Sequence, residues 1–237
     1  MGLGIIPSAV IALILSALLG MAIDYFFYYP LQKKKAASAI LMLTSLGLYI
    51  FIINTIALLY GNETKILRPG IEKTWEFWGI IINQIQVFEI IFFLFFLFVT
   101  LIILRYSKYG QSIRALTDNS QLAEVLGFEV GKIRLCIFAY GSILAGTGAI
   151  LSALDVGIDP HVGMAMVLIA AVSVIFAGVG AFIGAALAGV FIGIVQNLVV
   201  WQISARWQSA VTFIILLFIL IFRPQGIFTR KKRIEEL

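Results

Sequence analysis

Residues 85–104 read IQVFEIIFFLFFLFVTLIIL, and this stretch decides the fold class. About 20 predominantly apolar residues are what an α-helix needs to cross the hydrocarbon core of a bilayer. The one charged residue, Glu89, follows Gln84 and Gln86, so we expect Glu89 at the membrane interface rather than inside the bilayer. The apolar run is continuous rather than alternating, which favours a membrane-spanning helix over a barrel strand.

The rest of the chain has the same character, with 62% hydrophobic and 12% charged residues, whereas a typical soluble domain has about 25% charged residues. The apolar stretch 163–200 is too long for one crossing, and Gly178 and Gly180 lie near its middle, so we predict two helices with a tight reversal. We therefore predict an all-α polytopic membrane protein, a single domain over residues 1–237 with about seven transmembrane helices. The remaining spans are residues 5–23, 39–60, 134 or 135 to 154, and 209–222.

Most Lys and Arg residues fall in three short segments, namely residues 33–35, the loop 105–134 and the basic tail 223–237. This distribution indicates membrane topology rather than binding to nucleic acid, and the positive-inside rule places the three segments and the C-terminus in the cytoplasm. The loops 61–84, 155–161 and 201–208 are then outside. The same count puts Met1 outside without a charged flank, which leads us to expect that upstream helices are missing from this chain.

The cytoplasmic loop 106–132 carries signals for two short helices. Residues 110–112 offer a helix start, Asp118 with Gln121 resembles a capping box, and Gly127 suits a left-handed C-terminal position. We expect two short helices meeting at an angle on the cytoplasmic face. Such a rigid projection could be pushed by a soluble motor, or it could lie on the membrane as an interfacial helix.

Several motifs resemble the permeases of branched-chain amino acid ABC transporters, a family that includes urea-type relatives. They cover nearly the whole chain and begin with Tyr29-Pro30-Leu31, the Leu46-Gly47 region and Tyr60-Gly61. They continue with GQSIRALTDNSQLAEVLGFEVGKIR (110–134), FAYGSILAGTGAIL (138–151), AGVGAFIGA (177–185) and FRPQGIF (222–228). The chain departs from the family's pattern in lacking an Asn-Phe-Ala-His-Gly motif and in having Ala177-Gly178 for a Gly-Gly pair. Basic residues around Tyr-Pro-Leu are replaced by Tyr28 and Gln32.

The resemblance implies that loop 106–132 holds a coupling-helix motif that docks on an ATPase. The residues of this motif are Gly110, Arg114, Ala115, Asp118, Ala123, Glu124 and Gly127. Arg114 would be an exposed contact to the motor or to phospholipid, while Ala115 and Ala123 would allow close packing. The implied partners are a second permease subunit, identical or different, two cytoplasmic ATPase subunits, an extracytoplasmic solute-binding protein and membrane lipid. The implied location is the inner membrane of a prokaryote.

Small residues recur at four-residue spacing in the predicted spans, a pattern that lets helix backbones approach closely in lipid. These stripes serve helix packing, and they could also flank a translocation path. They include Gly141 and Ala145, Gly180 and Gly184, and Gly189 and Gly193. The amides of Gln196 and Asn197 lie inside an apolar span and need partners, so they either bridge helices or line a cavity.

The sequence carries no energy source of its own. Ionisable groups are nearly absent at mid-span, and there is no Gly-rich phosphate-binding loop. No paired carboxylates, metal-ligand spacing or Ser/His/Asp arrangement indicates an enzyme, a metal site or a cofactor. Our hypothesis is a permease subunit that imports branched-chain amino acids by alternating access driven by partner ATPases. The alternatives are the same machinery for urea, short amides or another small solute, and a non-transporting membrane scaffold.

Overall fold

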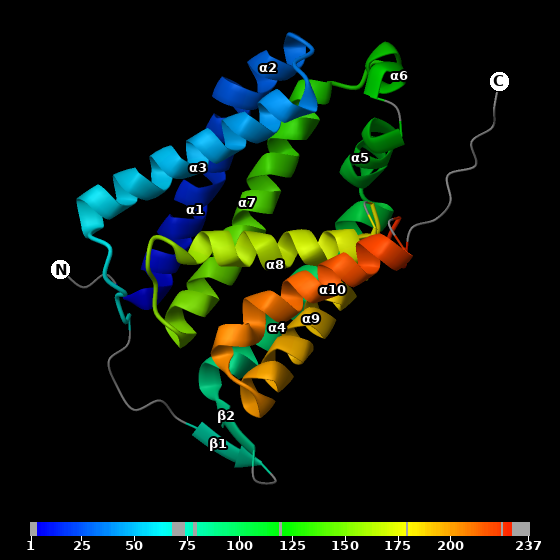
Figure 1. Ribbon diagram of the computed structural model, residues 1–237. Coiled ribbons are helices and arrows are strands. Elements are labelled where there is room, and N and C mark those ends of the chain that lie inside the picture. The colour runs from blue at the N-terminus through cyan, green and yellow to red at the C-terminus, as the bar shows by residue number, and fades with distance from the viewer. Residues whose placement is uncertain are drawn as a thin grey trace. The chain divides into compact units, whose positions relative to one another are not determined.

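The computed structural model describes residues 4–67, 74–77, 80–118, 120–178, 180–223 and 225–228 of the chain (Figure 1). The chain divides into two compact units, Met1–Pro160 and His161–Leu237. Unit 1 contains α1 (Ile5–Ile23), η1 (Asp24–Tyr28), α2 (Tyr29–Lys33), α3 (Ser38–Tyr60), β1 (Thr74–Phe77), β2 (Ile80–Asn83), α4 (Gln84–Tyr106), α5 (Lys108–Asp118), α6 (Ser120–Val125) and α7 (Val130–Asp155). Unit 2 contains α8 (Val162–Ala177), α9 (Phe182–Gln202), η2 (Ala205–Trp207) and α10 (Gln208–Phe222).

The predicted all-α membrane architecture is confirmed. Among the described residues, six helices are long and apolar enough to cross a membrane, and α8 is a shorter apolar helix. Large apolar side chains remain exposed along these helices, as expected for surfaces that face lipid; Leu58, for example, is 87% exposed. The stretch 163–200 does form two helices, because Gly178 and Gly180 adopt φ angles of 96° and 95° that reverse the chain.

The first span is longer than predicted, because the helix continues past Ile23 to Lys33. Pro30 lacks a backbone N–H, and its ring would clash with the carbonyl of residue 26 in a regular helix. The π-helical turn η1 relieves this conflict, and the Tyr29 N–H bonds back to the Asp24 carbonyl, five residues earlier. The helix thus bulges at residues 24–28 instead of ending there.

The helices α1 and α7 pack along each other at small residues (Figure 1). A Cβ on Gly20 would overlap the Ser142 hydroxyl, and a Cβ on Gly146 would lie 3.1 Å from the Ser16 Oγ. The Ser16 hydroxyl also donates to the Ser142 carbonyl at 2.9 Å. Close backbone approach and the hydrogen bond from the Ser16 hydroxyl therefore join α1 to α7, in the way expected for helices in lipid.

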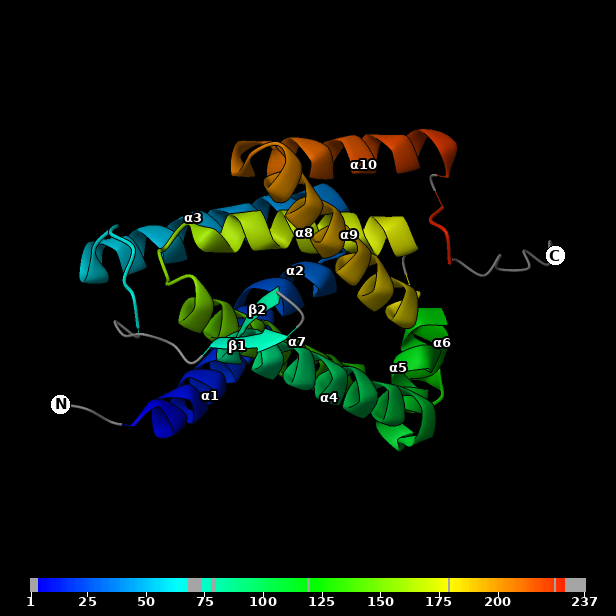
Figure 2. The same cartoon turned by 90° about the horizontal axis from the view of Figure 1, so that it is seen from below.

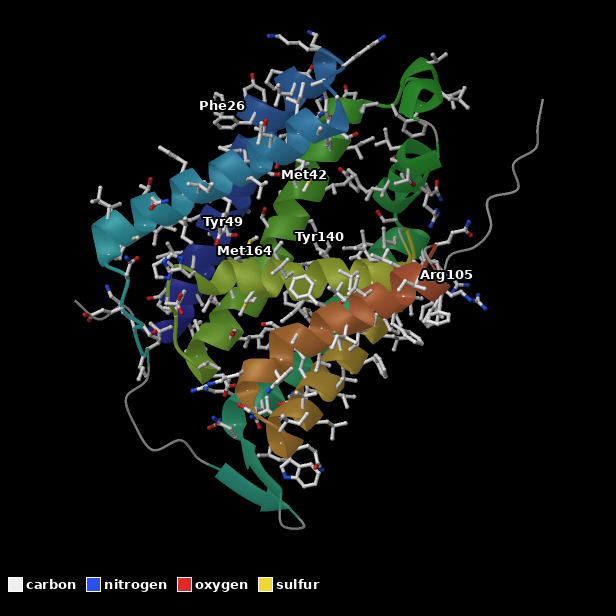
Figure 3. All side chains as sticks on the ribbon, in the orientation of Figure 1. Phe26, Met42, Tyr49, Arg105, Tyr140 and Met164 are labelled. Atoms are coloured by element: carbon white, nitrogen blue, oxygen red, sulfur yellow. The ribbon has the colours of Figure 1, made fainter. Side chains whose placement is uncertain are left out.

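The helix α4 packs on α7 and follows a β-hairpin that the sequence analysis did not predict. Strands β1 and β2 pair antiparallel, with Thr74 opposite Asn83, and lead into α4 (Figure 2). The Asn83 side chain then caps α4 in a capping box with Gln86. Between α4 and α7, the hydroxyls of Thr100 and Tyr140 lie 2.6 Å apart; Tyr140 is labelled on α7 in Figure 3.

In unit 2, α9 packs against α8, and α10 contacts both. The buried side of α9 consists of Gly184, Ala188 and Ile192, and the buried side of α8 includes Val172 and Ala177. Most of these buried residues are small, and small residues let helix backbones approach closely.

Candidate functional site

The loop between α4 and α7 forms the two predicted short helices, α5 and α6. Figure 2 shows them at the end of α4 that lies away from the β-hairpin. Helix α5 begins at Lys108, earlier than the predicted start at residues 110–112, because Ser107 caps it. The Ser107 Oγ accepts from the Tyr109 N–H at 3.1 Å, and the Ser107 carbonyl accepts from the Gln111 N–H at 3.2 Å.

Gly110 lies where α5 turns back against the end of α4. The residue is buried, and a Cβ at this position would overlap the carbonyl groups of Ile103 and Leu104. Any side chain would therefore push α5 away from α4. The contact explains why a glycine is needed here, independently of any role in docking.

Arg114 ties the same two helices together. Its Nη1 donates to the Leu104 carbonyl, one of the last carbonyls of α4, which lack partners inside the helix. A guanidinium at this end also interacts favourably with the helix dipole. Arg114 is exposed, so a partner or a phospholipid could still reach it; its predicted role as an external contact stays a prediction.

The second helix of the loop is held by a turn of the Schellman type. Gly127 adopts the predicted left-handed conformation with φ 87°, and the Phe128 N–H donates to the Ala123 carbonyl at 3.1 Å. Ala123 is 2% exposed and Ala115 is half-buried, so both pack within the chain, and their predicted role in docking stays a prediction. The side chains of Asp118 and Glu124 lie outside the described part of the chain.

Apolar side chains of this loop are exposed on its outer surface. Val125 is 84% exposed and Leu126 is 67% exposed, at the C-terminal end of α6. Tyr109 on α5 is 64% exposed. Large apolar groups on an otherwise polar projection are typical of a surface that contacts a partner or the membrane.

A buried ion pair near the start of α7 was missed by the sequence analysis. The Arg134 Nε lies 2.9 Å from Oδ1 and 3.0 Å from Oδ2 of Asp24, and Asp24 is fully buried. The Arg134 Nη1 donates to the Gln32 Oε1, and the guanidinium carbon lies 4.9 Å from the centre of the Tyr29 ring. Phe26 of the same turn extends outward from the helix (Figure 3) and is 68% exposed.

The signal for this pair was present but weak. Asp24 stands alone between the apolar run 5–23 and the aromatic residues that follow it, and the prediction ended the first span just before it. Arg134 stands at the predicted start of another span, on the same side of the membrane. Opposite charges at matching ends of two spans are candidates for pairing, but the sequence gives no reason to place these two helices together.

Some of the predicted packing residues lie close to a neighbouring segment, and others are exposed. Gly141 and Ala145 are exposed, and a Cβ on Gly141 would meet nothing within 4 Å. The stripe that packs on α1 is displaced by one residue, at Ser142 and Gly146. In unit 2, Gly189 lies beside Ser173, because a Cβ on Gly189 would be 3.6 Å from the Ser173 hydroxyl. Cβ atoms on Gly180 and Gly193 would meet nothing within 4 Å.

The two amides inside α9 behave differently. The Gln196 Nε2 donates to the Thr212 Oγ1 at 2.6 Å, and the Thr212 hydroxyl donates to the Gln208 carbonyl at 2.9 Å. Gln196 therefore bridges α9 to α10. The Asn197 amide donates to the Gly193 carbonyl of its own helix at 3.0 Å and is exposed.

After α10, residues 225–228 of the FRPQGIF motif lie against the end of α8. The Ile227 and Phe228 N–H groups donate to the carbonyls of Phe176 and Ala177, both at 2.9 Å. A Cβ on Gly184 would lie 2.9 Å from the Phe228 side chain. The segment thus satisfies carbonyls at the α8 terminus that have no partner inside the helix.

The chain is similar to a known family of membrane proteins. Residues 1–220 match the family model described as branched-chain amino acid transport system / permease component. The chain is 26% identical over 225 residues to the high-affinity branched-chain amino acid transport system permease protein LivH of Escherichia coli (strain K12), covering 92% of this chain and 72% of that protein.

Two further relatives are similar at the sequence level. The permease protein BraD of Pseudomonas aeruginosa, also of a high-affinity branched-chain amino acid transport system, is 26% identical over 241 residues, with 97% of this chain and 78% of that protein covered. The autoinducer 2 import system permease protein LsrC of Escherichia coli O9:H4 is 31% identical over 128 residues, with 51% and 37% covered. No solved structure matches.

Proposed function

Because this chain belongs to the family of permease components of branched-chain amino acid transport systems, we propose that it is the transmembrane subunit of an ATP-driven importer for these amino acids. The apolar helices and the relatives make it a multi-pass inner-membrane protein. The proposal goes further in naming the solute, the energy source and the part of the chain that receives the energy.

The coupling site in this proposal is the helical projection formed by α5 and α6, with Gly110, Arg114, Ala115, Asp118, Ala123, Glu124 and Gly127. The observation that carries it is the attachment of α5 to the end of α4 by the Gly110 contact and the Arg114 hydrogen bond. A projection anchored in this way transmits force to a transmembrane helix, whereas a loose loop would absorb it.

The orientation in this proposal is cytoplasmic for the projection and for the C-terminus. In unit 1, Figure 1 shows α2, α6 and the start of α7 at one end, and residues 33–35 at the end of α2 are all lysines. Clusters of Lys near span ends face the cytoplasm. Two cytoplasmic ATPase subunits would meet the projection there.

The mechanism we propose is alternating access. Closure of the two ATPase subunits would move α5 and α6, and the transmembrane helices of this chain and of a second permease subunit would tilt around the solute path. An extracytoplasmic binding protein would deliver the solute. A path walled by small and apolar side chains suits a solute with an aliphatic side chain.

The test is to purify the tagged chain from native membranes, to identify any ATPase that purifies with it, and to measure uptake of radiolabelled leucine by the reconstituted complex. The proposal expects an associated ATPase that is lost in Arg114→Glu and in Ala123→Trp, since both changes alter the docking face or its support. Retention of the ATPase by both variants would count against this coupling site. Competition by unlabelled urea or sugars, but not by isoleucine or valine, would contradict the proposed solute.

A further inference from the structure

The ion pair between Asp24 and Arg134 joins two segments that lie far apart in the chain. Arg134 belongs to the start of α7, directly after the α5–α6 projection, while Asp24 begins the π-helical turn η1 of the first long helix. The Arg134 side chain is 17% exposed and the Asp24 side chain is 0% exposed. The contact therefore holds the N-terminal end of α7 against the first long helix.

Stability alone does not account for this pair. Removing two charges from water carries a desolvation cost that their attraction often only offsets, and apolar residues of similar volume commonly serve as well. Asp24 Oδ1 has no hydrogen bond within good geometry, although the Arg134 Nε lies 2.9 Å from it. A charge pair at this position is better explained by the fixed geometry that it imposes between α7 and the first long helix than by its contribution to the free energy of folding.

The local structure around Asp24 supports a mechanical role. The π-helical turn η1 makes the Asp24 carbonyl accept from the Tyr29 N–H, and such turns inside helices are frequently found at functional sites. The same guanidinium also holds Gln32 and lies over the Tyr29 ring. Arg134 of α7 thus contacts the first residue of η1 as well as residues that follow η1.

A short hydrogen-bonded connection links the projection to Arg134. The Phe128 N–H bonds to the Ala123 carbonyl at 3.1 Å, the Val130 N–H to the Phe128 carbonyl at 2.8 Å, and the Ile133 N–H to the Glu129 carbonyl at 3.1 Å. Residues between α6 and α7 are therefore held to the helices on either side. The connection between α6 and α7 is thus a hydrogen-bonded segment rather than an unconstrained linker.

We infer that Asp24 and Arg134 are positioning residues that carry the movement of the α5–α6 projection into the first long helix, at its π-helical turn. This inference rests on the proposed function, because it needs an ATPase that moves the projection. The ion pair would keep α7 and the first helix in a fixed position relative to each other, so that both tilt together when the projection is pushed.

The test compares the whole transporter carrying wild-type chain, Arg134→Gln, or the apolar pair Asp24→Leu/Arg134→Met. For each we would measure the bound ATPase, the rate of ATP hydrolysis and the leucine imported per ATP hydrolysed. We expect the apolar pair to assemble and hydrolyse ATP, because it leaves no unpaired buried charge. Its import per ATP should fall at least about fivefold, the lower range of typical coupling between sites.

The matched control is Lys132→Gln, two residues earlier on α7. Lys132 pairs only with Glu129 among the described residues, at 2.5 Å on an exposed surface, so its import per ATP should equal that of wild type. The swapped pair Asp24→Arg/Arg134→Asp should recover part of the import per ATP lost in Arg134→Gln. A pair with a merely structural role would change protein yield without changing this ratio.

The outcomes separate the inference from the proposed function. An apolar pair that imports leucine per ATP as well as wild type does would overturn the inference and leave the proposed function intact. Loss of ATPase binding in the apolar pair, at normal yield, would also overturn it, because the pair would then serve assembly. A wild-type chain that binds no ATPase would overturn the proposed function itself.

Discussion

Gly110 illustrates how a single position controls the α5–α6 projection. Its hydrogen atom faces the carbonyl groups of Ile103 and Leu104, where a methyl group does not fit. Arg114, one helical turn later, reaches the Leu104 carbonyl from the same helix. The two residues set the approach of α5 to α4, and neither contact needs a partner protein.

Gly110→Ala should therefore weaken the projection's attachment to α4. Overpacking of a close contact typically destabilises by about 1–3 kcal/mol, and we expect a lower melting temperature in detergent together with less bound ATPase. The control is Gly131→Ala in α7, where an added Cβ would meet nothing within 4 Å. Equal melting temperatures for the two variants would show that the Gly110 contact is unimportant.

At the scale of elements, the molecule uses short polar or small-residue contacts to join helices that are apolar on most sides. Gln196 and Thr212 form a hydrogen bond between α9 and α10, and the N–H groups of Ile227 and Phe228 bond to carbonyls at the end of α8. In a bilayer the hydrophobic effect does not bring helices together, so such contacts decide which helices are neighbours.

The Gln196 bridge should be measurable as a coupling between α9 and α10. Hydrogen bonds between membrane helices contribute about 0.6 kcal/mol on average, so a double-mutant cycle with Gln196→Leu and Thr212→Val should give a coupling energy near that value. Asn197→Leu, which removes only a bond within α9, should show no coupling to Thr212→Val. Purely additive effects of Gln196→Leu and Thr212→Val would contradict the bridge.

The segment 225–228 should be sensitive at Gly226. This residue has φ 81°, and a Cβ on it would overlap Gly178. Gly226→Ala should lower thermal stability more than Gly61→Ala, because Gly61 has a similar φ of 86° but open space around it. Both variants carry strain from a positive φ, and the strain at Gly61 is at least as large because its ψ of 170° lies in a region that almost only glycine adopts. A larger drop in melting temperature for Gly226→Ala is therefore a lower limit for the effect of the contact with Gly178.

For the whole molecule, the orientation in the membrane is the property on which the proposed coupling depends. In a Cys136→Ser background, Asp118→Cys in intact cells should resist a membrane-impermeant maleimide and react only after the membrane is opened. Glu63→Cys, in the loop after α3, should react in intact cells. Labelling of the cysteine at 118 from outside would place the projection away from any cytoplasmic ATPase and end the proposal.

The number and approximate length of the helices followed from local properties. Continuous apolar runs and the glycines at 127, 178 and 180 act over a few residues, so their structural effects could be predicted from the sequence. The π-helical turn before Pro30, which carries the first helix on to Lys33, was not predicted. The resemblance also drew attention to Gly110 and Arg114. It did not indicate that both contact the end of α4, because that depends on how α5 folds back.

What the sequence by itself determined is a helical membrane protein of the permease family with a structured projection between two spans. Only the tertiary structure decided that α7 presents Ser142 and Gly146 rather than Gly141 and Ala145 to α1, and that Asp24 meets Arg134. The physical reason is that helices apolar on all sides have no polar face to fix their rotation. Which residues face a neighbour is then decided by contacts between segments far apart in the chain.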